Sequence, residues 1–224
     1  MHKVRILCFG DSNTWGFIPG SVDYDTGFIG RYSDEIRWTG LLQRKLGSNY
    51  TVIEEGLNGR TTSIDYPDIP HRRGTDYLEP CLYTHAPLDV VILQLGLNDL
   101  KTFFNRSPDD VAMGVSELVK IVCQSHYGVD MMSPPAVLLV SPPLLRNESF
   151  RDANGNYIFS GAMVKSVGLA RRYAEVAKSH QCAFVDLASE GVVLSSTDGL
   201  HLDRKGHLRC AAVMFDAVMS LRAW

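Results

Sequence analysis

The sequence lacks the features that place a chain in a membrane or on a nucleic acid. No apolar run approaches the roughly 18 residues that a membrane-spanning helix needs. The net charge is −3, so no basic excess favours nucleic acid or an anionic membrane surface. No signal segment with an apolar centre opens the chain. We therefore expect a cytoplasmic protein without a membrane anchor.

Cysteine is sparse, and the sequence shows no pairing pattern. The five cysteines are scattered, odd in number and never spaced as C-x-x-C. Cys8, Cys123 and Cys182 lie in apolar runs. We expect buried free thiols rather than disulfides.

What is present is the composition of an ordinary globular domain. The chain has 224 residues, of which 45% are hydrophobic and 21% are charged, enough to bury a sizeable core. No repeat, low-complexity segment or linker divides it. Residues 1–224 are therefore expected to form a single domain.

Short apolar runs alternate with helical patterns along the whole chain. Buried strands are expected at residues 3–9, 50–55, 89–95, 136–141 and 182–187. Helices are expected at residues 37–47, 76–84, 107–125, 160–180 and 203–222. Asp34 or Ser33 is expected to cap the first helix, and Ser107 with Pro108 to begin the third. The alternation predicts an α/β fold, a three-layer α/β/α sandwich on a five-stranded parallel sheet with right-handed crossovers.

The longest loops follow strands rather than helices. They cover roughly residues 10–35, 56–75, 96–107 and 142–160. Ligands of open α/β sheets bind at the carboxyl ends of the strands, where such loops meet. Any site is expected at that edge.

Three residues in these loops have the chemistry of a nucleophilic triad. Ser12 follows the first strand in "GDSNTWG", and Asp198 and His201 follow the fifth in "STDGLHLD". A serine hydroxyl needs an adjacent base, and that histidine needs an acceptor for its other N–H. A carboxylate three residues from the histidine can supply it. Donors for an oxyanion are available from the Ser12 and Gly59 amides and the Asn98 side chain.

Each motif also has a plain structural interpretation. Asp11 and Ser12 can simply cap a turn, "GLND" is an ordinary turn sequence, and His201 can cap a helix or pair with Asp198 in a loop. The conjunction is what favours catalysis, because the motifs follow several strands and are all expected at one edge of the sheet.

With these residues in place, the sequence resembles the SGNH hydrolases of the GDSL esterase–lipase family. The four name-giving residues match Ser12, Gly59, Asn98 and His201 in order, and the resemblance spans the whole chain. It implies a flavodoxin-like fold, Ser12 as nucleophile, Asp198 and His201 completing the triad, and Gly59 and Asn98 in the oxyanion hole. It implies a serine esterase that needs no metal and no cofactor.

A narrower resemblance is to small intracellular aryl esterases that also act as acyltransferases. It rests on "ILCFGDSNTWGFIPG", "RWTGLLQRKLG", "VIEEGLNGRTT", "LGLNDLK" and "LLVSPPLL". It implies short acyl chains, especially acetyl, transfer to alcohols or peroxide, and a homo-oligomer such as an octamer, with walls and subunit contacts in segments 17–35 and 142–160. Asn13 stands where the family usually has leucine, which bears on the acyl pocket.

Several side chains near the expected site have two interpretations. Trp15, Phe17 and Trp38 either form apolar walls beside the nucleophile or pack under a loop, and Lys101 either rims the mouth or is simply solvated.

Three other functions compete with this one. A metal-dependent hydrolase would use Asp198, His201, Asp203 and His207, but the six-residue spacing of the histidines turns them about 240° apart on a helix. A non-catalytic binding module would normally lack part of the triad. Within the enzymes, a carbohydrate O-acetyl esterase, lysophospholipase or thioesterase remains an alternative, because the triad is indifferent to the alcohol.

Overall fold

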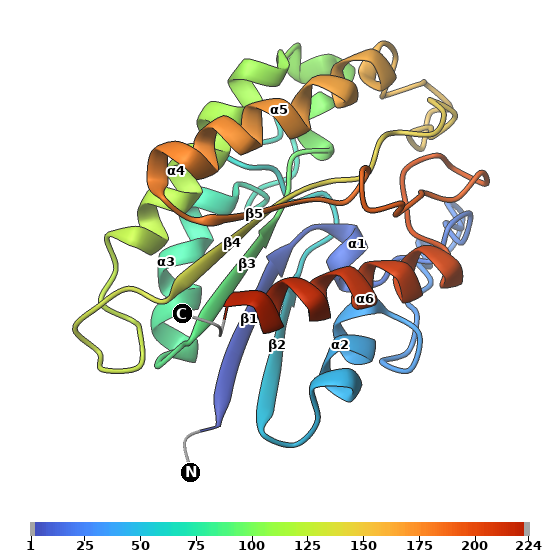
Figure 1. Ribbon diagram of the computed structural model, residues 1–224. Coiled ribbons are helices and arrows are strands. Elements are labelled where there is room, and N and C mark those ends of the chain that lie inside the picture. The colour runs from blue at the N-terminus through green and yellow to red at the C-terminus, as the bar shows by residue number, and fades with distance from the viewer. Residues whose placement is uncertain (1–2, 222–224) are drawn as a thin grey trace.

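The computed structural model describes residues 3–221, and a five-stranded sheet runs through its centre (Figure 1). The strands are β1 Val4–Gly10, β2 Tyr50–Gly56, β3 Val90–Gln94, β4 Ala136–Ser141 and β5 Ala183–Asp186. All neighbouring strands are parallel, in the order β2-β1-β3-β4-β5. Each predicted strand is confirmed to within one residue at either end.

The expected helices are present, with differences at their ends. They are α2 Trp38–Leu46, α3 Gly74–His85, α4 Pro108–Cys123, α5 Ala162–His180 and α6 Arg204–Leu221. Helix α3 is longer than the predicted 76–84, and the predicted end of the last helix at residue 222 lies outside the described residues. The sequence analysis did not anticipate α1 Ser12–Trp15 or the 3₁₀ turns η1 Asn98–Leu100 and η2 Thr102–Phe104.

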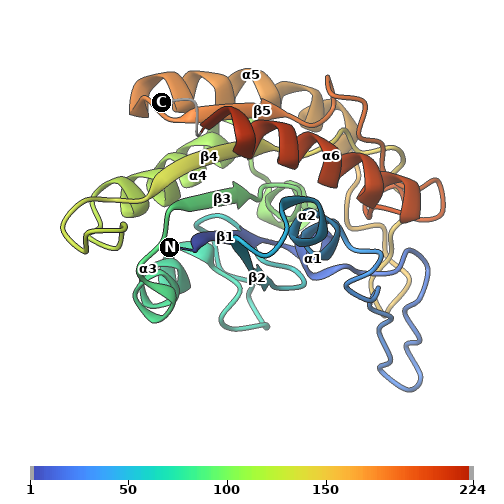
Figure 2. The same ribbon diagram turned by 60° about the horizontal axis from the view of Figure 1, so that its bottom comes forward.

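The helices form two layers, one on each face of the sheet (Figures 1 and 2). Helices α2 and α6 pack together on one face, and α3, α4 and α5 on the other. The chain moves outward from β1 to β2 and then crosses back to β3, and the connecting helix changes face at that reversal. A constant right-handed crossover requires this change, so the topology follows the rule for parallel sheets.

The two predicted helix starts have different outcomes. Ser107 caps α4 as predicted, accepting a hydrogen bond from the Asp110 amide at 3.2 Å, with Pro108 in the first turn. The predicted cap of α2 by Asp34 or Ser33 is wrong. The Ser33 carbonyl accepts from the amides of residues 36 and 37, which closes a separate turn, and α2 begins after Arg37 with no side-chain cap.

The core lies on both faces of the sheet, as expected for parallel strands without polar alternation. Ile6, Leu7, Cys8 and Phe9 of β1 are fully buried in succession. All five cysteines are free, as predicted, although Cys123 and Cys182 are only partly buried. None of the helices in the described part of the chain is long and apolar enough to cross a membrane.

Strand order places the loops after β1 and β3 at the point where the chain reverses direction across the sheet. In doubly wound folds this switch point opens a crevice at the carboxyl edge, because the connections on its two sides leave in opposite directions. Ser12 follows β1 and Asn98 follows β3, so both lie at the switch point.

Candidate active site

Ser12 is held at the start of α1 by a tight strand-to-helix turn. Asp11 caps this short helix, its carboxylate accepting a hydrogen bond from the Asn13 amide at 2.9 Å. Burial raises the pKa of Asp11 to about 6, although the Asn13 amide acts in the opposite direction. Gly10 makes the turn possible, since a Cβ there would lie 2.0 Å from Thr14 Oγ1. The turn therefore fixes the position of the Ser12 hydroxyl.

The triad predicted from the sequence is brought together by the fold. His201 Nε2 lies 2.9 Å from Ser12 Oγ, and His201 Nδ1 lies 2.8 Å from Asp198 Oδ2. The other carboxylate oxygen of Asp198 accepts from the Leu200 and His201 amides. All three triad residues are at least 94% buried, which shields their interactions from water.

The environment of Asp198 favours its ionised form. Burial acts to raise the pKa of Asp198, but hydrogen bonds and charge interaction with His201, together with the two backbone amides, outweigh it and lower the pKa. An ionised Asp198 can stabilise an imidazolium and holds His201 with Nε2 toward the serine.

Two aromatic rings hold the imidazole from different sides. Phe17 stacks on His201 with ring centroids 3.9 Å apart and planes 19° apart. Phe150 meets the same ring edge-on at 5.7 Å. Phe17 therefore forms the apolar wall beside the triad that the sequence suggested, and Phe150, which the sequence analysis did not single out, forms another.

The proposed oxyanion donors lie in the two loops beside Ser12. Gly59 has φ +78°, a conformation that favours glycine, and a Cβ there would lie 3.2 Å from the Tyr66 hydroxyl. The Asn98 side-chain amide donates to the Arg60 carbonyl at 3.1 Å, which orients it and leaves its second N–H for a ligand. The Ser12 amide lies in the first turn of α1, where backbone amides have no partner within the helix.

Asn13 is buried and does not present its amide to an acyl group. Its Nδ2 donates to the Leu200 carbonyl at 3.1 Å, and its Oδ1 accepts from the Leu202 amide at 2.8 Å. The interpretation of Asn13 as a pocket residue is therefore corrected: the side chain fastens the turn after β1 to the loop that carries His201. A leucine could not make either bond.

For Trp38 and Lys101 the structure removes one of the two interpretations made from sequence. Trp38 is fully buried in the core and forms no pocket wall. Lys101 is not a solvated lysine, because its ammonium donates to the Tyr66 hydroxyl at 2.6 Å and burial lowers its pKa to about 8. Trp15 is partly buried, with the Arg31 guanidinium 5.0 Å from its ring centroid.

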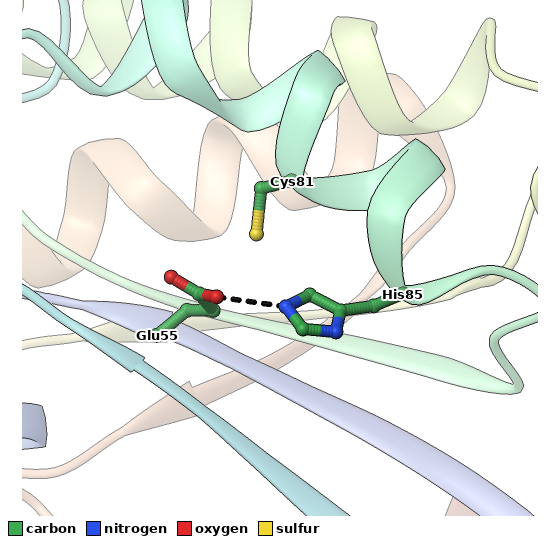
Figure 3. Close-up of side chains that lie close together, drawn as sticks. All are labelled: Glu55, Cys81 and His85. Atoms are coloured by element: carbon green, nitrogen blue, oxygen red, sulfur yellow. Dashed lines mark hydrogen bonds and ion pairs between the residues drawn. The ribbon is translucent and has the colours of Figure 1, made fainter.

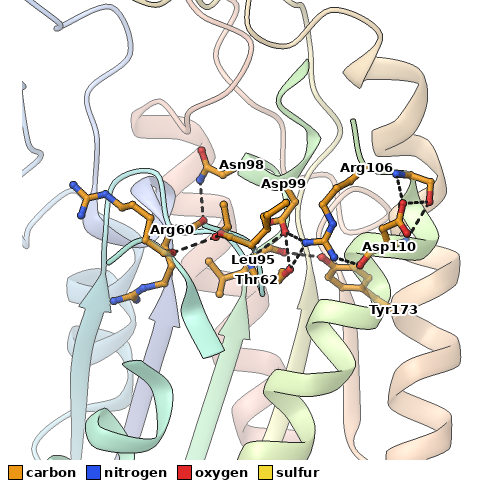
Figure 4. A network of polar contacts seen from close by, with 12 residues as sticks. Arg60, Thr62, Leu95, Asn98, Asp99, Arg106, Asp110 and Tyr173 are labelled. Atoms are coloured by element: carbon orange, nitrogen blue, oxygen red, sulfur yellow. Dashed lines mark hydrogen bonds and ion pairs between the residues drawn. The ribbon is translucent and has the colours of Figure 1, made fainter. Parts of the chain in front are cut away.

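A polar network behind the oxyanion loops was missed at the sequence level (Figure 4). The Asp99 carboxylate accepts from the Thr62 hydroxyl at 2.6 Å and from the Arg106 guanidinium at 2.7 Å. Asp99 is fully buried and adjoins Asn98. The network thus ties the loop after β2 to the loop after β3. The only sequence signal was an acidic residue next to Asn98 in "GLND", which a turn explains equally well.

The residues considered for a metal-dependent hydrolase have other contacts. Asp203 accepts from the Gly206 amide at the start of α6, and His207 Nδ1 accepts from the Trp38 amide at 3.2 Å. His207 is fully buried, and burial lowers its pKa to about 3. His201 faces Ser12 instead of His207, so these four side chains do not form a common ligand set.

A family model supports the conclusion suggested by this geometry. The model of the GDSL-like Lipase/Acylhydrolase family matches residues 8–209, which include all the triad and oxyanion residues named above. The chain belongs to this family. As a GDSL-like acylhydrolase it is a carboxylic ester hydrolase, with the three-layer α/β/α fold expected from the sequence.

Solved structures of similar proteins match nearly the full length of this GDSL-like chain. An aryl esterase from M. smegmatis is 40% identical, with a TM-score of 0.88 and coverage of 97% of this chain and 99% of that one. A carbohydrate acetylesterase from Sinorhizobium meliloti is 37% identical, with a TM-score of 0.88 and coverage of 98% and 100%. A search of curated proteins found no match.

Proposed function

We propose that this chain is a serine esterase that hydrolyses short-chain, acetyl-type esters such as aryl acetates. The observation that carries the proposal is the continuous contact from Ser12 Oγ to His201 Nε2 and from His201 Nδ1 to Asp198. The similarity to an aryl esterase supports the alcohol part of the substrate. The chemistry uses no metal and no cofactor.

The first half of the reaction forms an acyl-enzyme. Ser12 Oγ attacks the ester carbonyl carbon while its proton passes to His201 Nε2, and Asp198 stabilises the imidazolium. The developing oxyanion accepts hydrogen bonds from the Ser12 and Gly59 amides and the Asn98 side chain. The ester C–O bond then breaks, and the departing phenol or alcohol takes the proton from Nε2.

The second half releases the acyl group. A water molecule gives a proton to His201 Nε2 as its oxygen attacks the acyl carbon, and the same donors hold the oxyanion. Collapse expels Ser12 Oγ, which recovers its proton from Nε2, and the carboxylic acid leaves. An alcohol in place of water would yield a new ester by the same steps.

The preference for short acyl groups is supported by crowding around the nucleophile. Ser12 is only 5% exposed, and Phe17 and Phe150 both contact the neighbouring imidazole. Little space next to the reacting carbon disfavours long chains, because overpacking a rigid pocket costs about 1–3 kcal/mol.

The experiment is hydrolysis of p-nitrophenyl esters from acetyl to octanoyl, with EDTA present throughout. Wild type should show kcat/KM falling steeply beyond short chains, and Ser12→Ala should lose on the order of 10⁴–10⁶ in kcat. Ser189→Ala, which removes a hydroxyl on an exposed turn, is the matched control and should keep full activity. Activity that survives Ser12→Ala, or none on any ester, would contradict the proposal.

A carbohydrate O-acetyl esterase is the second candidate, favoured by the 37% identity to a carbohydrate acetylesterase. The two functions share the triad and differ in the alcohol. Comparing kcat/KM for phenyl acetate and for an acetylated sugar separates them, and the larger value identifies the preferred class.

Acyl transfer in water is also part of the proposal. The triad is at least 94% buried, and a site that excludes bulk water favours an apolar acceptor alcohol over hydrolysis. The product ratio of transfer to hydrolysis with added benzyl alcohol tests this. A ratio no higher than the alcohol-to-water mole ratio would remove transfer from the proposal.

A homo-oligomer in the cytoplasm completes the proposal. Apolar side chains on the two long loops are exposed, including Tyr24, Phe28, Leu144 and Tyr157. The Tyr24 hydroxyl donates to the Arg151 carbonyl, so the two loops form one surface. Free thiols suit a reducing compartment. Light scattering after gel filtration tests the assembly, and a monomer at micromolar concentration would contradict it.

A further inference from the structure

A second cluster of reactive side chains lies on the far side of β2 from Glu54. Glu55, Cys81 and His85 bring a carboxylate oxygen, a thiol and an imidazole nitrogen within 4.8 Å of one another (Figure 3). Glu55 Oε1 is 2.7 Å from His85 Nε2. None of the three belongs to the catalytic triad or the oxyanion loops, and the ester chemistry makes no use of them.

The local structure explains why these side chains converge. Cys81 and His85 are four residues apart on α3 and therefore share one helix face. Successive residues of a strand point to opposite faces, so Glu54 contacts Arg37 beside α2 while Glu55 contacts His85 of α3. Figure 3 shows the thiol and the imidazole of the helix directed at the Glu55 carboxylate.

We propose that Glu55, Cys81 and His85 bind one Zn²⁺ ion, which fastens the edge strand β2 to α3. Thiolate and imidazole together select zinc over the hard cations, and three protein ligands leave a fourth position for water. Two histidines at i, i+4 on a helix form half of a known zinc-binding pattern, and a cysteine and a histidine at this spacing present their donors in the same way.

The distances suit a tetrahedral zinc ion after small side-chain movements. Zn–N, Zn–O and Zn–S bonds of about 2.0–2.3 Å place neighbouring ligand atoms roughly 3.3–3.6 Å apart. The ligand atoms of Glu55, Cys81 and His85 are now between 2.7 Å and 4.8 Å apart, so some are closer and some farther than a zinc ion requires. The Glu55–His85 contact would open slightly and the thiol would move closer.

The charge balance also permits a cation here. Coordination breaks the Sγ–H bond of Cys81, its proton leaves to solvent, and the thiolate and carboxylate then neutralise Zn²⁺. The nearby Arg60 guanidinium is directed to backbone, donating to the Gly10 carbonyl at 2.9 Å and lying 4.0 Å from the Phe9 ring centroid. A zinc ion with one thiolate and one carboxylate ligand sums to zero charge, so the occupied site places no net positive charge beside Arg60.

A route for the ion is available from solvent. Glu55 lines a cavity of about 490 Å³ together with Leu57, Arg60 and Tyr77. The side chains of Glu55 and His85 are 19% and 26% exposed, while Cys81 is buried. The ion can therefore reach the carboxylate and imidazole first and the thiol last.

The test uses untagged protein stripped with chelator and titrated with Co²⁺ and then Zn²⁺. Co²⁺ should give a thiolate-to-metal charge-transfer band at a stoichiometry of one, and Zn²⁺ should abolish it. Cys81→Ser should lose the band, and Glu55→Gln and His85→Ala should weaken Zn²⁺ binding by at least the roughly 10–100-fold that outer-shell changes cost. Wild type with Zn²⁺ should melt at a higher temperature than the stripped protein.

Cys123→Ser is the matched control, since it removes a partly buried thiol outside the cluster and should keep the band. A missing band in wild type, or a band that survives Cys81→Ser, would overturn the proposal. If Cys81→Ser does not fold, the test uses Glu55→Gln, which keeps the shape of the side chain. A Zn²⁺ affinity equal to that of wild type would then overturn the proposal. Esterase activity should persist in chelator, so failure of this site leaves the proposed function untouched.

Discussion

At the scale of single residues, the site is ordered by side chains outside the triad. Asn13 bonds both Leu200 and Leu202, one on each side of His201. Phe17 covers one face of the same imidazole. The base is thus positioned from a segment that adjoins the nucleophile itself, which links the two halves of the triad.

Asn13→Ala should therefore reduce catalysis without removing a catalytic group. We expect kcat to fall by about 10²-fold, the cost of a misplacement of about 1 Å, with KM little changed. Asn13→Asp keeps the acceptor for the Leu202 amide and loses the donor to the Leu200 carbonyl. Its kcat should therefore lie between those of wild type and Asn13→Ala. Steady-state kinetics on an aryl acetate measure both. Equal kcat for all three proteins would contradict the positioning role.

Asn98→Ala tests the oxyanion hole directly. Removing one preorganised donor should cost roughly 10²–10³ in kcat, because that hydrogen bond strengthens as negative charge develops. KM should change little, since the ground-state carbonyl carries less charge. The same measurement on Asn49→Ala, an exposed amide on the turn before β2 and away from the site, provides the control. A change in KM alone would show that Asn98 binds substrate without stabilising the transition state.

At the scale of elements, the oxyanion loops depend on the network behind them. Asp99 joins Thr62 in the loop after β2 to Arg106 ahead of α4 (Figure 4). The side chain of Asp99 is fully buried and that of Arg106 is 13% exposed, so the pair is held away from water. Loss of one partner leaves the other as an uncompensated charge.

Asp99→Asn should destabilise the protein and loosen the loops together. Breaking a buried ion pair costs about 3–5 kcal/mol of unfolding free energy, measured by urea denaturation. At urea concentrations below the unfolding transition, the variant should show a larger fall in kcat than rise in KM, relative to wild type. Arg172→Gln, which removes the more exposed ion pairs of Arg172 with Asp109 and Glu175, should cost less than about 1 kcal/mol and leave kcat unchanged. Full kcat in folded Asp99→Asn would limit the network to stability.

The sequence predicts strands well here and predicts contacts between loops poorly. A parallel strand buried on both faces needs a continuous apolar run, and "VRILCF" and "VVILQL" have no other good explanation. The triad was predictable because nucleophile, base and acid are restricted to few residue types. The role of Asn13 was misjudged, and those of Trp38 and Lys101 were left open. Their partners lie far away in the chain or in the core, and no local pattern encodes such contacts.

At the scale of the whole molecule, the two helices on one face of the sheet, α2 and α6, are joined by a histidine whose pKa is shifted by burial. His207 of α6 accepts from the Trp38 amide at the start of α2, and burial lowers its pKa to about 3. The unfolded chain gains a proton at this position below pH 6.5, whereas the folded chain stays neutral down to about pH 3. Titration of His207 therefore leaves the free energy of unfolding unchanged above pH 6.5 and lowers it as the pH falls below that value.

This predicts an acid sensitivity that one substitution should reduce. Between pH 7 and pH 5 the His207 contribution to the free energy of unfolding should fall by about 2 kcal/mol. In His207→Asn the amide oxygen can still accept from Trp38, but nothing at that position titrates. Urea midpoints of both proteins at the two pH values measure the difference. An equal loss in wild type and variant would assign the sensitivity to other groups.

The separation of Ser12 and His201 by 189 positions in the sequence has a consequence for when the chain becomes active during synthesis and folding. The nucleophile is synthesised 189 residues before the base, so a partly made chain carries a serine with no partner. Hydrolysis can begin only when β5 has joined the sheet and the final loop has closed over the first turn. Turnover of a chromogenic ester is thus a direct readout of the assembled triad, and a refolding experiment followed in this way reports the step that brings Ser12 and His201 together.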